Sequence, residues 1–402
     1  MKRLSLLLIL LTLLSFAGYS KVWTLSDSNL NVKFDDQLRV LTVTDIRCNK
    51  TWEQVPFKDD FSISKVTQKG NSLEITLTGS IKLGLNITLT AESDLAFTLK
   101  ADVKAVFKEL TIPSAFKTPD NTHYLLYTDG EGFLLQADDK EYPLGNGITY
   151  SCGGGLSMAW MGVVDNKLEA GYMAILETPF DAALRTKRED GLVTFSPVWM
   201  TSMEKFSYDR KVLYHFFDKG GYVAQCKKYR EYIWEKNNVI TLRENQKKTP
   251  AIEKMIGAVH MYVWDNARDV SFAKDIKQAG IEKAFILWDA NHTPYPEKDY
   301  DNRLKELGYA SGVYDLYTDA HPRDSIPRPV DNEMKGAWLN RGNYPGLFKE
   351  ITARKADGKF YSNSFGTYIC PLAVRPEIIK RIEKELPIYP HESYFLDVGG
   401  WQ

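Results

Sequence analysis

The chain has 402 residues, with 51 lysines and arginines against 52 aspartates and glutamates, so its formal net charge is −1. This balance gives no electrostatic reason to expect binding to nucleic acid or to an anionic membrane surface. The length has room for two domains of ordinary size. Aromatic residues are abundant, with 9 tryptophans and 22 tyrosines. A large core would explain many of them, but aromatic rings also line binding pockets.

The first twenty residues read as a secretory signal peptide. Lys2 and Arg3 give a positive start, Leu4–Phe16 is almost wholly apolar, and Gly18-Tyr-Ser20 offers small residues for cleavage. The apolar run is short for a membrane-spanning helix, although an uncleaved anchor is the alternative. We therefore expect an exported protein, periplasmic or extracellular, that has no membrane contact after cleavage.

Residues 21–218 show the period-two alternation of half-buried antiparallel strands. The clearest alternating stretches are Leu30–Phe34, Leu73–Leu77, Ile81–Leu89 and Leu95–Leu99. Many strands with almost no helical periodicity over some 200 residues predict a β-sandwich domain.

The pattern changes at Lys219. Apolar residues then recur at three- and four-residue spacing, namely Tyr222, Cys226, Tyr229 and Ile233. This spacing predicts one apolar face of a helix that ends near Asn237. A polar stretch follows, so residues 219–250 are predicted to be a bridging helix and a linker.

From Ala251 onward the sequence alternates between strand and helix patterns. The predicted strands are Met255–Trp264, Lys283–Trp288, Ser311–Tyr317 and Tyr394–Val398. The predicted helices are Asp269–Ala279, Tyr300–Leu307 and one that is opened by Pro376 and stopped by Pro387. A full (β/α)8 barrel needs about 250 residues, so residues 251–402 are predicted to form its first half, with four βα units.

Every predicted strand of this half-barrel ends in polar or aromatic residues. These candidate substrate-binding residues are Trp264, Trp288, Asp289, His292, Tyr314, Asp315, Asp319, His321 and Trp401, and Asp397 ends the fourth strand. Catalytic residues of parallel barrels project from the carboxyl ends of the strands. Carboxylates, imidazoles and indoles would offer a sugar both hydrogen-bond acceptors and flat apolar faces. Each residue alone could be a cap, a rim salt bridge or a core aromatic, but the pattern on four strands predicts a site.

Neither the histidines nor the cysteines show a metal-binding pattern. His292 and His321 have no close partner of the HxH or HExxH kind, and the four cysteines lack CxxC spacing. We therefore expect no metal and no cofactor. His260 lies in the middle of a predicted strand and is expected to be a core histidine, and the cysteines are expected to be mostly buried.

The order of segments resembles a known group of enzymes. A signal peptide, a strand-rich domain, a helix at Tyr222–Trp234 and a barrel strand that reads Tyr394-Phe-Leu-Asp-Val resemble the endo-α-N-acetylgalactosaminidase family with its exo-acting and Bacteroides-type relatives. The resemblance spans residues 21–402. It implies a galactose-mutarotase-like β-supersandwich over residues 21–218, followed by a TIM-barrel catalytic domain, and a partner that is an α-linked glycan.

The resemblance also implies roles for residues. Asp397 would be the nucleophile of a retaining glycoside hydrolase that acts on α-linked galactosyl or N-acetylgalactosaminyl groups. Asp289, Asp315 and Asp319 would bind sugar hydroxyls, while Trp264, Trp288 and Trp401 would form subsite walls.

One role has no matching residue in this sequence. The resemblance places the general acid/base on a glutamate at the end of a fifth strand, and a retaining mechanism needs the two carboxyl groups about 5–5.5 Å apart. The expectation is therefore a hydrolase fragment with negligible turnover as this chain. A non-catalytic carbohydrate-binding or degenerate enzyme-like protein is the alternative. A polysaccharide lyase is a third possibility, which the strand–helix repeats disfavour.

Overall fold

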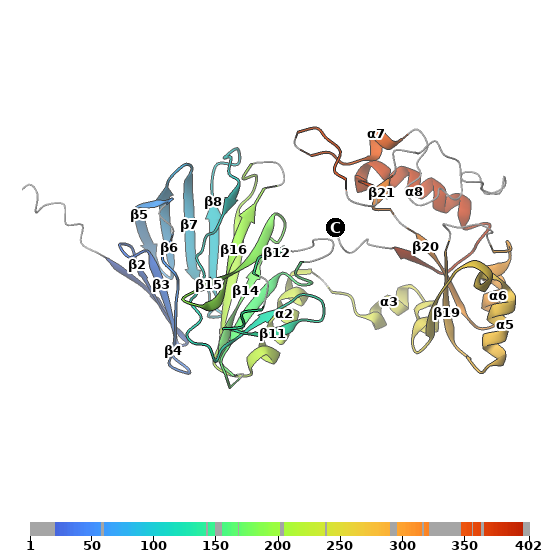
Figure 1. Cartoon of the computed structure of the whole chain (residues 1–402), viewed down its shortest axis with the longest axis horizontal. Helices are drawn as coiled ribbons and strands as arrows, with labels where there is room; N and C mark the ends of the chain where they lie inside the picture. Colours follow the sequence, from blue (N-terminus) through green and yellow to red (C-terminus); the bar gives the residue numbers. More distant parts are fainter. Residues whose placement is uncertain are drawn as a thin grey trace, which may run out of the picture. The chain divides into compact units, whose positions relative to one another are not determined.

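The computed structural model describes residues 21–57, 60–141, 144–148, 155–167, 169–201, 205–237, 239–289, 296–315, 317–320, 347–355, 357–362 and 366–396. The chain divides into two compact units, Met1–Asn237 and Asn238–Gln402, called unit 1 and unit 2 below (Figure 1). The predicted signal peptide lies outside the described residues. No helix in the described part of the chain is long and apolar enough to cross a membrane.

Unit 1 is built from three antiparallel sheets. The first contains β1 (Val22–Ser26), β2 (Leu30–Asp35), β3 (Val40–Asp45) and β4 (Lys50–Glu53). The second has nine strands, in the order β11 (Phe133–Gln136), β10 (Tyr124–Tyr127), β13 (Trp160–Val164), β14 (Gly171–Leu176), β17 (Arg210–Phe217), β8 (Leu95–Lys100), β7 (Lys82–Leu89), β6 (Ser72–Thr78) and β5 (Ser62–Lys69). The third contains β12 (Asn146–Ile148), β15 (Ala182–Glu189), β16 (Leu192–Met200) and β9 (Glu109–Leu110).

A single hydrophobic core joins the three sheets. It includes Val32 from the first sheet, Leu85 from the second and Phe195 from the third. Because side chains alternate across a strand, every second residue of β6 and β7 is buried in this core. The strands predicted from that alternation are confirmed at β2, β6, β7 and β8, and Figure 1 shows β5 to β8 side by side.

The predicted helix is also confirmed, as α2 (Gly221–Asn237). It belongs to unit 1, where Tyr229 packs with Trp160 and Ile175 of the nine-stranded sheet. The predicted apolar face is partly wrong, because Tyr222 and Cys226 are exposed. The side of the helix that carries Tyr229 packs against the nine-stranded sheet instead.

Unit 2 centres on a parallel sheet whose strand order follows the chain. Its strands are β18 (Val259–Val263), β19 (Ala284–Asp289), β20 (Ala310–Asp315) and β23 (Ser393–Leu396). Two short strands, β21 (Asp319–Ala320) and β22 (Thr367–Tyr368), pair antiparallel. The helices are α3 (Leu242–Lys248), α4 (Ile252–Met255), the 3-10 turn η1 (Asp265–Arg268), α5 (Val270–Gln278), α6 (Tyr300–Glu306), α7 (Phe348–Ile351) and α8 (Pro371–Glu385).

The first strand of unit 2 differs from its prediction. A strand over Met255–Trp264 with both faces buried was expected, but α4 occupies the start of this range and β18 is largely exposed. His260, expected in the core, is exposed as well. The physical reason is that α5 and α6 cover one face of the sheet. On the other face, Met255 and Ala258 pack against the cluster of Phe285, Leu287 and Ala310 but leave much of β18 exposed within the described residues.

The last helix also begins earlier than predicted. Pro376 was expected to open it, but α8 starts at Pro371 and contains Pro376 in its interior. A proline inside a helix leaves the carbonyl four residues earlier without its helical donor. That residue is Leu372, which is 85% exposed, so water can satisfy its carbonyl.

The cysteines are less buried than predicted. Cys48 and Cys370 are half-buried, Cys226 is exposed, and all three are free thiols. Cys152 lies outside the described residues.

Candidate functional site

The carboxyl ends of the parallel strands lie along one edge of the unit 2 sheet. Asp289, the last residue of β19, pairs with Tyr314 of β20, and Asp315 pairs with Leu396, the last residue of β23. Trp264 directly follows β18. Four predicted site residues, Trp264, Asp289, Tyr314 and Asp315, are therefore at or next to this edge.

Alternation divides the side chains of this sheet between two faces. Ile286 and Val313 point to the face that α5 and α6 cover, where they join the main core of unit 2. Phe285 and Leu287 point to the opposite face and belong to a separate, smaller cluster. We call the face that carries Phe285 and Leu287 the open face.

The open face has a row of aromatic rings at the carboxyl edge, formed by Tyr262, Trp264, Tyr314 and Phe395. The ring centroids of Tyr262 and Trp264 are 4.1 Å apart, those of Tyr262 and Tyr314 are 5.0 Å apart, and those of Tyr314 and Phe395 are 5.7 Å apart. Trp264 and Phe395 remain 49% and 45% exposed. This aromatic row offers accessible apolar surface, and such surface lines many ligand sites.

Asp289 lies beside this row. By alternation it is on the same face as Leu287, but it is only 1% exposed, so its predicted contact with sugar is not supported. Its backbone carbonyl accepts a hydrogen bond of 2.9 Å from Nη1 of Arg268. Nε of the same arginine donates to the carbonyl of Asp265 at 3.3 Å. Arg268 is only 3% exposed, so a buried guanidinium ties the ends of β18 and β19 together.

Sequence reasoning missed this arginine, whose only signal is its position one turn after a predicted strand. Asp265, which it contacts, has a positive φ of 47°. Such a backbone conformation is uncommon outside glycine, although aspartate tolerates it better than most residues. Arg268 thus supports the local backbone from which Trp264 and Asp289 extend.

Two predicted site residues lie on the covered side instead. Trp288 is fully buried, its Nε1 donates to Oδ1 of Asp301 at 3.4 Å, and its ring lies 5.1 Å from that of Tyr389. Asp315 is buried in an ion pair with Arg381 of α8. Neither side chain is placed where a sugar could reach it.

Beneath α8 there is a buried polar cluster that sequence reasoning missed. Burial, together with the negative charge of Asp315, raises the pKa of Glu385 to about 8. Burial and the nearby Lys305 lower the pKa of His391 to about 4. Oε1 of Glu385 accepts a 3.1 Å hydrogen bond from the Tyr394 hydroxyl and lies 3.2 Å from Nε2 of His391.

A glutamate with a pKa near 8 resembles a general acid, because perturbed pKa values often mark functional groups. Its position argues against that role. Glu385 has no exposed side-chain surface and contacts Tyr394, whose ring packs against the covered core of unit 2. The cluster therefore joins α8 to β23 and does not touch the open face.

The remaining predicted site residues cannot be placed. Asp397, His292, His321 and Trp401 lie outside the described residues, and Asp319 is described only by its backbone in β21. Among the side chains that the structure does describe, no three His, Cys, Asp or Glu are arranged to hold one metal ion.

Comparison with known proteins identifies a family to which part of the chain is similar. Residues 275–401 match the sequence model of the glycosyl hydrolases related to the GH101 family, GH129. This part of the chain is similar to the GH129 family. The matched stretch contains β19, β20 and β23 and extends through Asp397. No curated protein matches the chain.

Solved structures show the same fold as this chain. The α-N-acetylgalactosaminidase NagBb from Bifidobacterium bifidum, in its Gal-NHAc-DNJ complex, is 15% identical with a TM-score of 0.73, covering 93% of this chain and 69% of that one. Its GalNAc complex is 16% identical with a TM-score of 0.70, covering 90% and 68%. The ligand-free form is 15% identical with a TM-score of 0.71, covering 92% and 69%.

Proposed function

We propose that this chain is a retaining glycoside hydrolase that acts on α-linked galactosyl or N-acetylgalactosaminyl residues, with Asp397 as its nucleophile. The match to GH129 supports the reaction class. The substrate class is suggested by the similar solved structures, which are those of an α-N-acetylgalactosaminidase and of its GalNAc complex.

One observation carries the proposal. Strand β23 lies parallel to β20 and ends at Leu396, opposite Asp315, at the edge where Asp289 ends β19. The next residue in the sequence is Asp397. Catalytic groups of parallel barrels extend from this edge, so the carboxylate follows the strand at the position that such chemistry uses.

The described residues have distinct roles in this proposal. Trp264, which is exposed, would contact the apolar face of the sugar. Tyr314 and Asp289, which are only 7% and 1% exposed, would support the aromatic row and the strand end without touching the sugar. Asp397 would attack the anomeric carbon while the bond to the leaving oxygen breaks, giving a covalent glycosyl ester. Trp288 and Asp315 are given no contact with substrate because they are buried. His292, Asp319, His321 and Trp401 remain predicted sugar contacts.

We assign the general acid/base to no described residue. The resemblance places it after a fifth strand, whereas the parallel sheet of the described residues has four. General acid–base catalysis contributes about 10²- to 10⁴-fold, so the cleavage of natural glycosides, whose leaving oxygen needs a proton, depends on that group. An aryl glycoside with an acidic phenol needs no such proton and should still react.

The architecture and location belong to the same proposal. We propose that residues 251–402 form the first half of a (β/α)8 barrel, that residues 21–218 form a galactose-mutarotase-like supersandwich, and that residues 219–250 bridge them. We further propose that residues 1–20 direct export and are removed.

The decisive experiment uses 2,4-dinitrophenyl α-N-acetylgalactosaminide and the corresponding galactoside with the purified chain. We expect release of about one equivalent of phenolate, a mass increase of one glycosyl group, and the adduct on the peptide that contains Asp397. Azide, which attacks without a general base, should then release an α-glycosyl azide with retained configuration.

Two variants make the result specific. Asp397→Asn should form no adduct, whereas Asp265→Asn, at another carboxylate of the same edge, should still form it. If the Asp397→Asn chain forms the same adduct as the parent, or if neither sugar labels the parent chain, the proposed function is wrong.

A further inference from the structure

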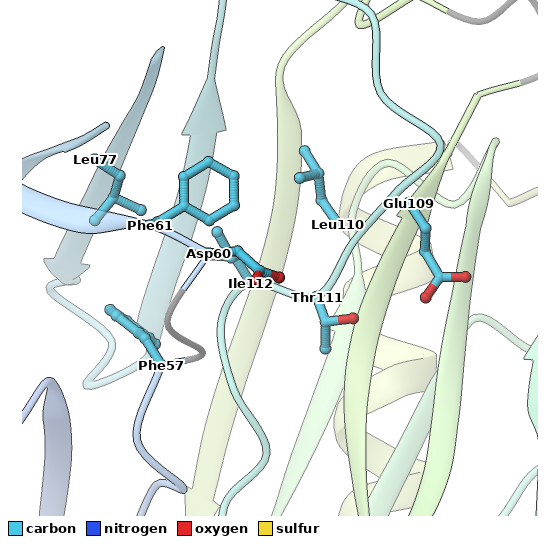
Figure 2. Close-up of a pocket in the computed structure, with 8 residues that line it drawn as sticks. All are labelled: Phe57, Asp60, Phe61, Leu77, Glu109, Leu110, Thr111 and Ile112. Atoms are coloured by element: carbon cyan, nitrogen blue, oxygen red, sulfur yellow. The ribbon is translucent and has the colours of Figure 1, made fainter. Parts of the chain in front are cut away.

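Unit 1 contains a pocket that is unrelated to the sheet edge of unit 2. It has a volume of about 200 Å³ and lies between the segment that leads into β5 and the segment around β9 (Figure 2). Phe57, Phe61 and Leu77 line one side, while Glu109 and Thr111 lie on the other. We call it the sandwich pocket.

The volume limits what this pocket can hold. Pockets for drug-sized ligands measure about 300–1,000 Å³, so this one suits a single small ring. Its base is apolar, since Phe57 and Leu77 belong to the core of unit 1 and Phe61 packs against that core. A bound ring would therefore meet aromatic and aliphatic surface below and beside it.

The aromatic wall is fixed in place by its backbone. The carbonyl of Phe61 accepts a 3.2 Å hydrogen bond from Nη1 of Arg39. Gly79 approaches the same segment so closely that a Cβ there would lie 2.3 Å from the carbonyl oxygen of Asp60 and 2.8 Å from Cδ1 of Phe61. A wall held in this way needs little ordering when a ligand binds, which favours affinity.

The opposite side of the pocket is polar and equally fixed. Both carboxylate oxygens of Glu109 contact the guanidinium fork of Arg185, with Nη2 to Oε2 at 2.6 Å. Such bidentate pairs hold a carboxylate in one orientation while leaving lone pairs for other donors. The hydroxyl of Thr111 and the carboxylate of Asp60, which Figure 2 shows between the two walls, complete the polar set.

We propose that the sandwich pocket binds one neutral pyranose unit of a glycan, as a second carbohydrate site separate from the sheet edge of unit 2. The aromatic wall meets the apolar face of the ring, and the fixed oxygens of Glu109, Thr111 and Asp60 meet its hydroxyls. The choice of galactose-type sugars as probes rests on the proposed function.

The test measures the binding of free galactose and N-acetylgalactosamine to the full chain by saturation-transfer NMR. Trp264→Ala is present throughout to weaken binding at the unit 2 edge. We expect saturable binding to persist in this background. Adding Phe61→Ala should raise the dissociation constant by about two- to thirteenfold, which corresponds to the loss of an aromatic contact of about 0.5–1.5 kcal/mol.

The matched control is Phe180→Ala, another phenylalanine of unit 1, which is 71% exposed and does not line the pocket; it should leave the dissociation constant unchanged. Thr111→Val tests the polar side without removing a ring, in case Phe61→Ala lowers stability. Absence of saturable binding in the Trp264→Ala background, or unchanged binding in the properly folded pocket variants, would overturn the proposal. Binding that persists in a chain that forms no adduct at Asp397 would refute only the hydrolase.

Discussion

Glu385 shows how a single residue can have the pKa of a catalytic acid without being one. Its carboxyl is fully buried and interacts with groups from several neighbouring elements, namely Asp315 at the end of β20, Arg381 on α8, Asp301 on α6, His391, and Tyr394 on β23. With a pKa of about 8 for Glu385 and about 4 for His391, both side chains are neutral at pH 7. A neutral pair costs less to bury than two charges.

This pair predicts how the stability of unit 2 depends on pH. The folded state holds the proton of Glu385 up to about pH 8, whereas the unfolded state loses it near pH 4.5, so stability falls between these values. His391 acts oppositely between about pH 4 and 6.5, because only the unfolded state is protonated there. Burial raises the pKa of Asp301 to about 6. Asp301 therefore adds a further loss of stability with rising pH, which is complete near pH 6. Between pH 6.5 and 8, Glu385 is the only one of these three groups that still makes the stability depend on pH.

Glu385→Gln isolates this contribution, because glutamine mimics the protonated carboxyl. The free energy of unfolding of the parent, measured by urea denaturation, should fall by up to about 1.4 kcal/mol per pH unit between pH 6.5 and 8. The Gln variant should lack this decline. Glu383→Gln on the same helix is the matched control and should retain it. If the free energy of unfolding fell equally with pH in the parent and in the Glu385→Gln variant, the prediction would be contradicted.

At the residue scale, the sequence located the strand ends of unit 2 but not the environment of each side chain. Trp288 and Asp289 are neighbours at the end of one predicted strand, and both were predicted to contact sugar. Alternation places them on opposite faces, Trp288 under the helices and Asp289 beside the aromatic row, and both are buried. Which face the helices cover depends on tertiary packing, and a local pattern does not contain that information.

At the scale of elements, Gly312 of β20 is required by the packing of the open face. A Cβ there would lie 2.7 Å from Cδ2 of Leu287, 3.1 Å from the carbonyl oxygen of Ser393 and 3.2 Å from Cζ of Phe285. The Ser393 carbonyl belongs to the backbone of the paired strand and cannot easily move. The strands β19, β20 and β23 therefore need a glycine at this position.

Gly312→Ala should lower the free energy of unfolding of unit 2 by about 1–3 kcal/mol, the usual cost of overpacking. The matched control is Gly84→Ala in β7, where the nearest atom to an added Cβ is 3.8 Å away. That change should be neutral or slightly stabilising, because alanine in a strand loses less chain entropy than glycine. Equal losses in the two variants, measured by thermal denaturation, would show that crowding at Gly312 is not the cause.

Periodicity predicted elements well where one local pattern decides the structure. The alternating leucines and isoleucines of β6 and β7 face one core, and Asp269 caps the start of α5 by accepting a hydrogen bond from the backbone of Ser271. The start of α8 was predicted wrongly at Pro376, because a proline usually marks a helix start. Here an exposed carbonyl at Leu372 makes an internal proline tolerable, and exposure is not visible in the pattern.

At the scale of the whole molecule, the two units differ in how completely their cores are covered. In unit 1, β13 and β14 are buried along their entire length. In unit 2, within the described residues, β18 and β23 are mostly exposed or half-buried, and Val259, Trp264, Phe395 and Leu396 leave large apolar side chains accessible. Local opening costs less where fewer apolar contacts are buried.

Hydrogen exchange followed by mass spectrometry on the full chain should therefore show two opening free energies. Peptides from β18 and β23 should exchange through a lower-energy opening than peptides from β13 and β14, which serve as the control within the same digest. Because Glu385 lies in unit 2, raising the pH from 6.5 to 8 should lower only the opening free energy of unit 2, after correction for the intrinsic exchange rate. A common opening free energy for both sets of strands would mean that the units unfold as one, and the open face of unit 2 would then have no cost in stability.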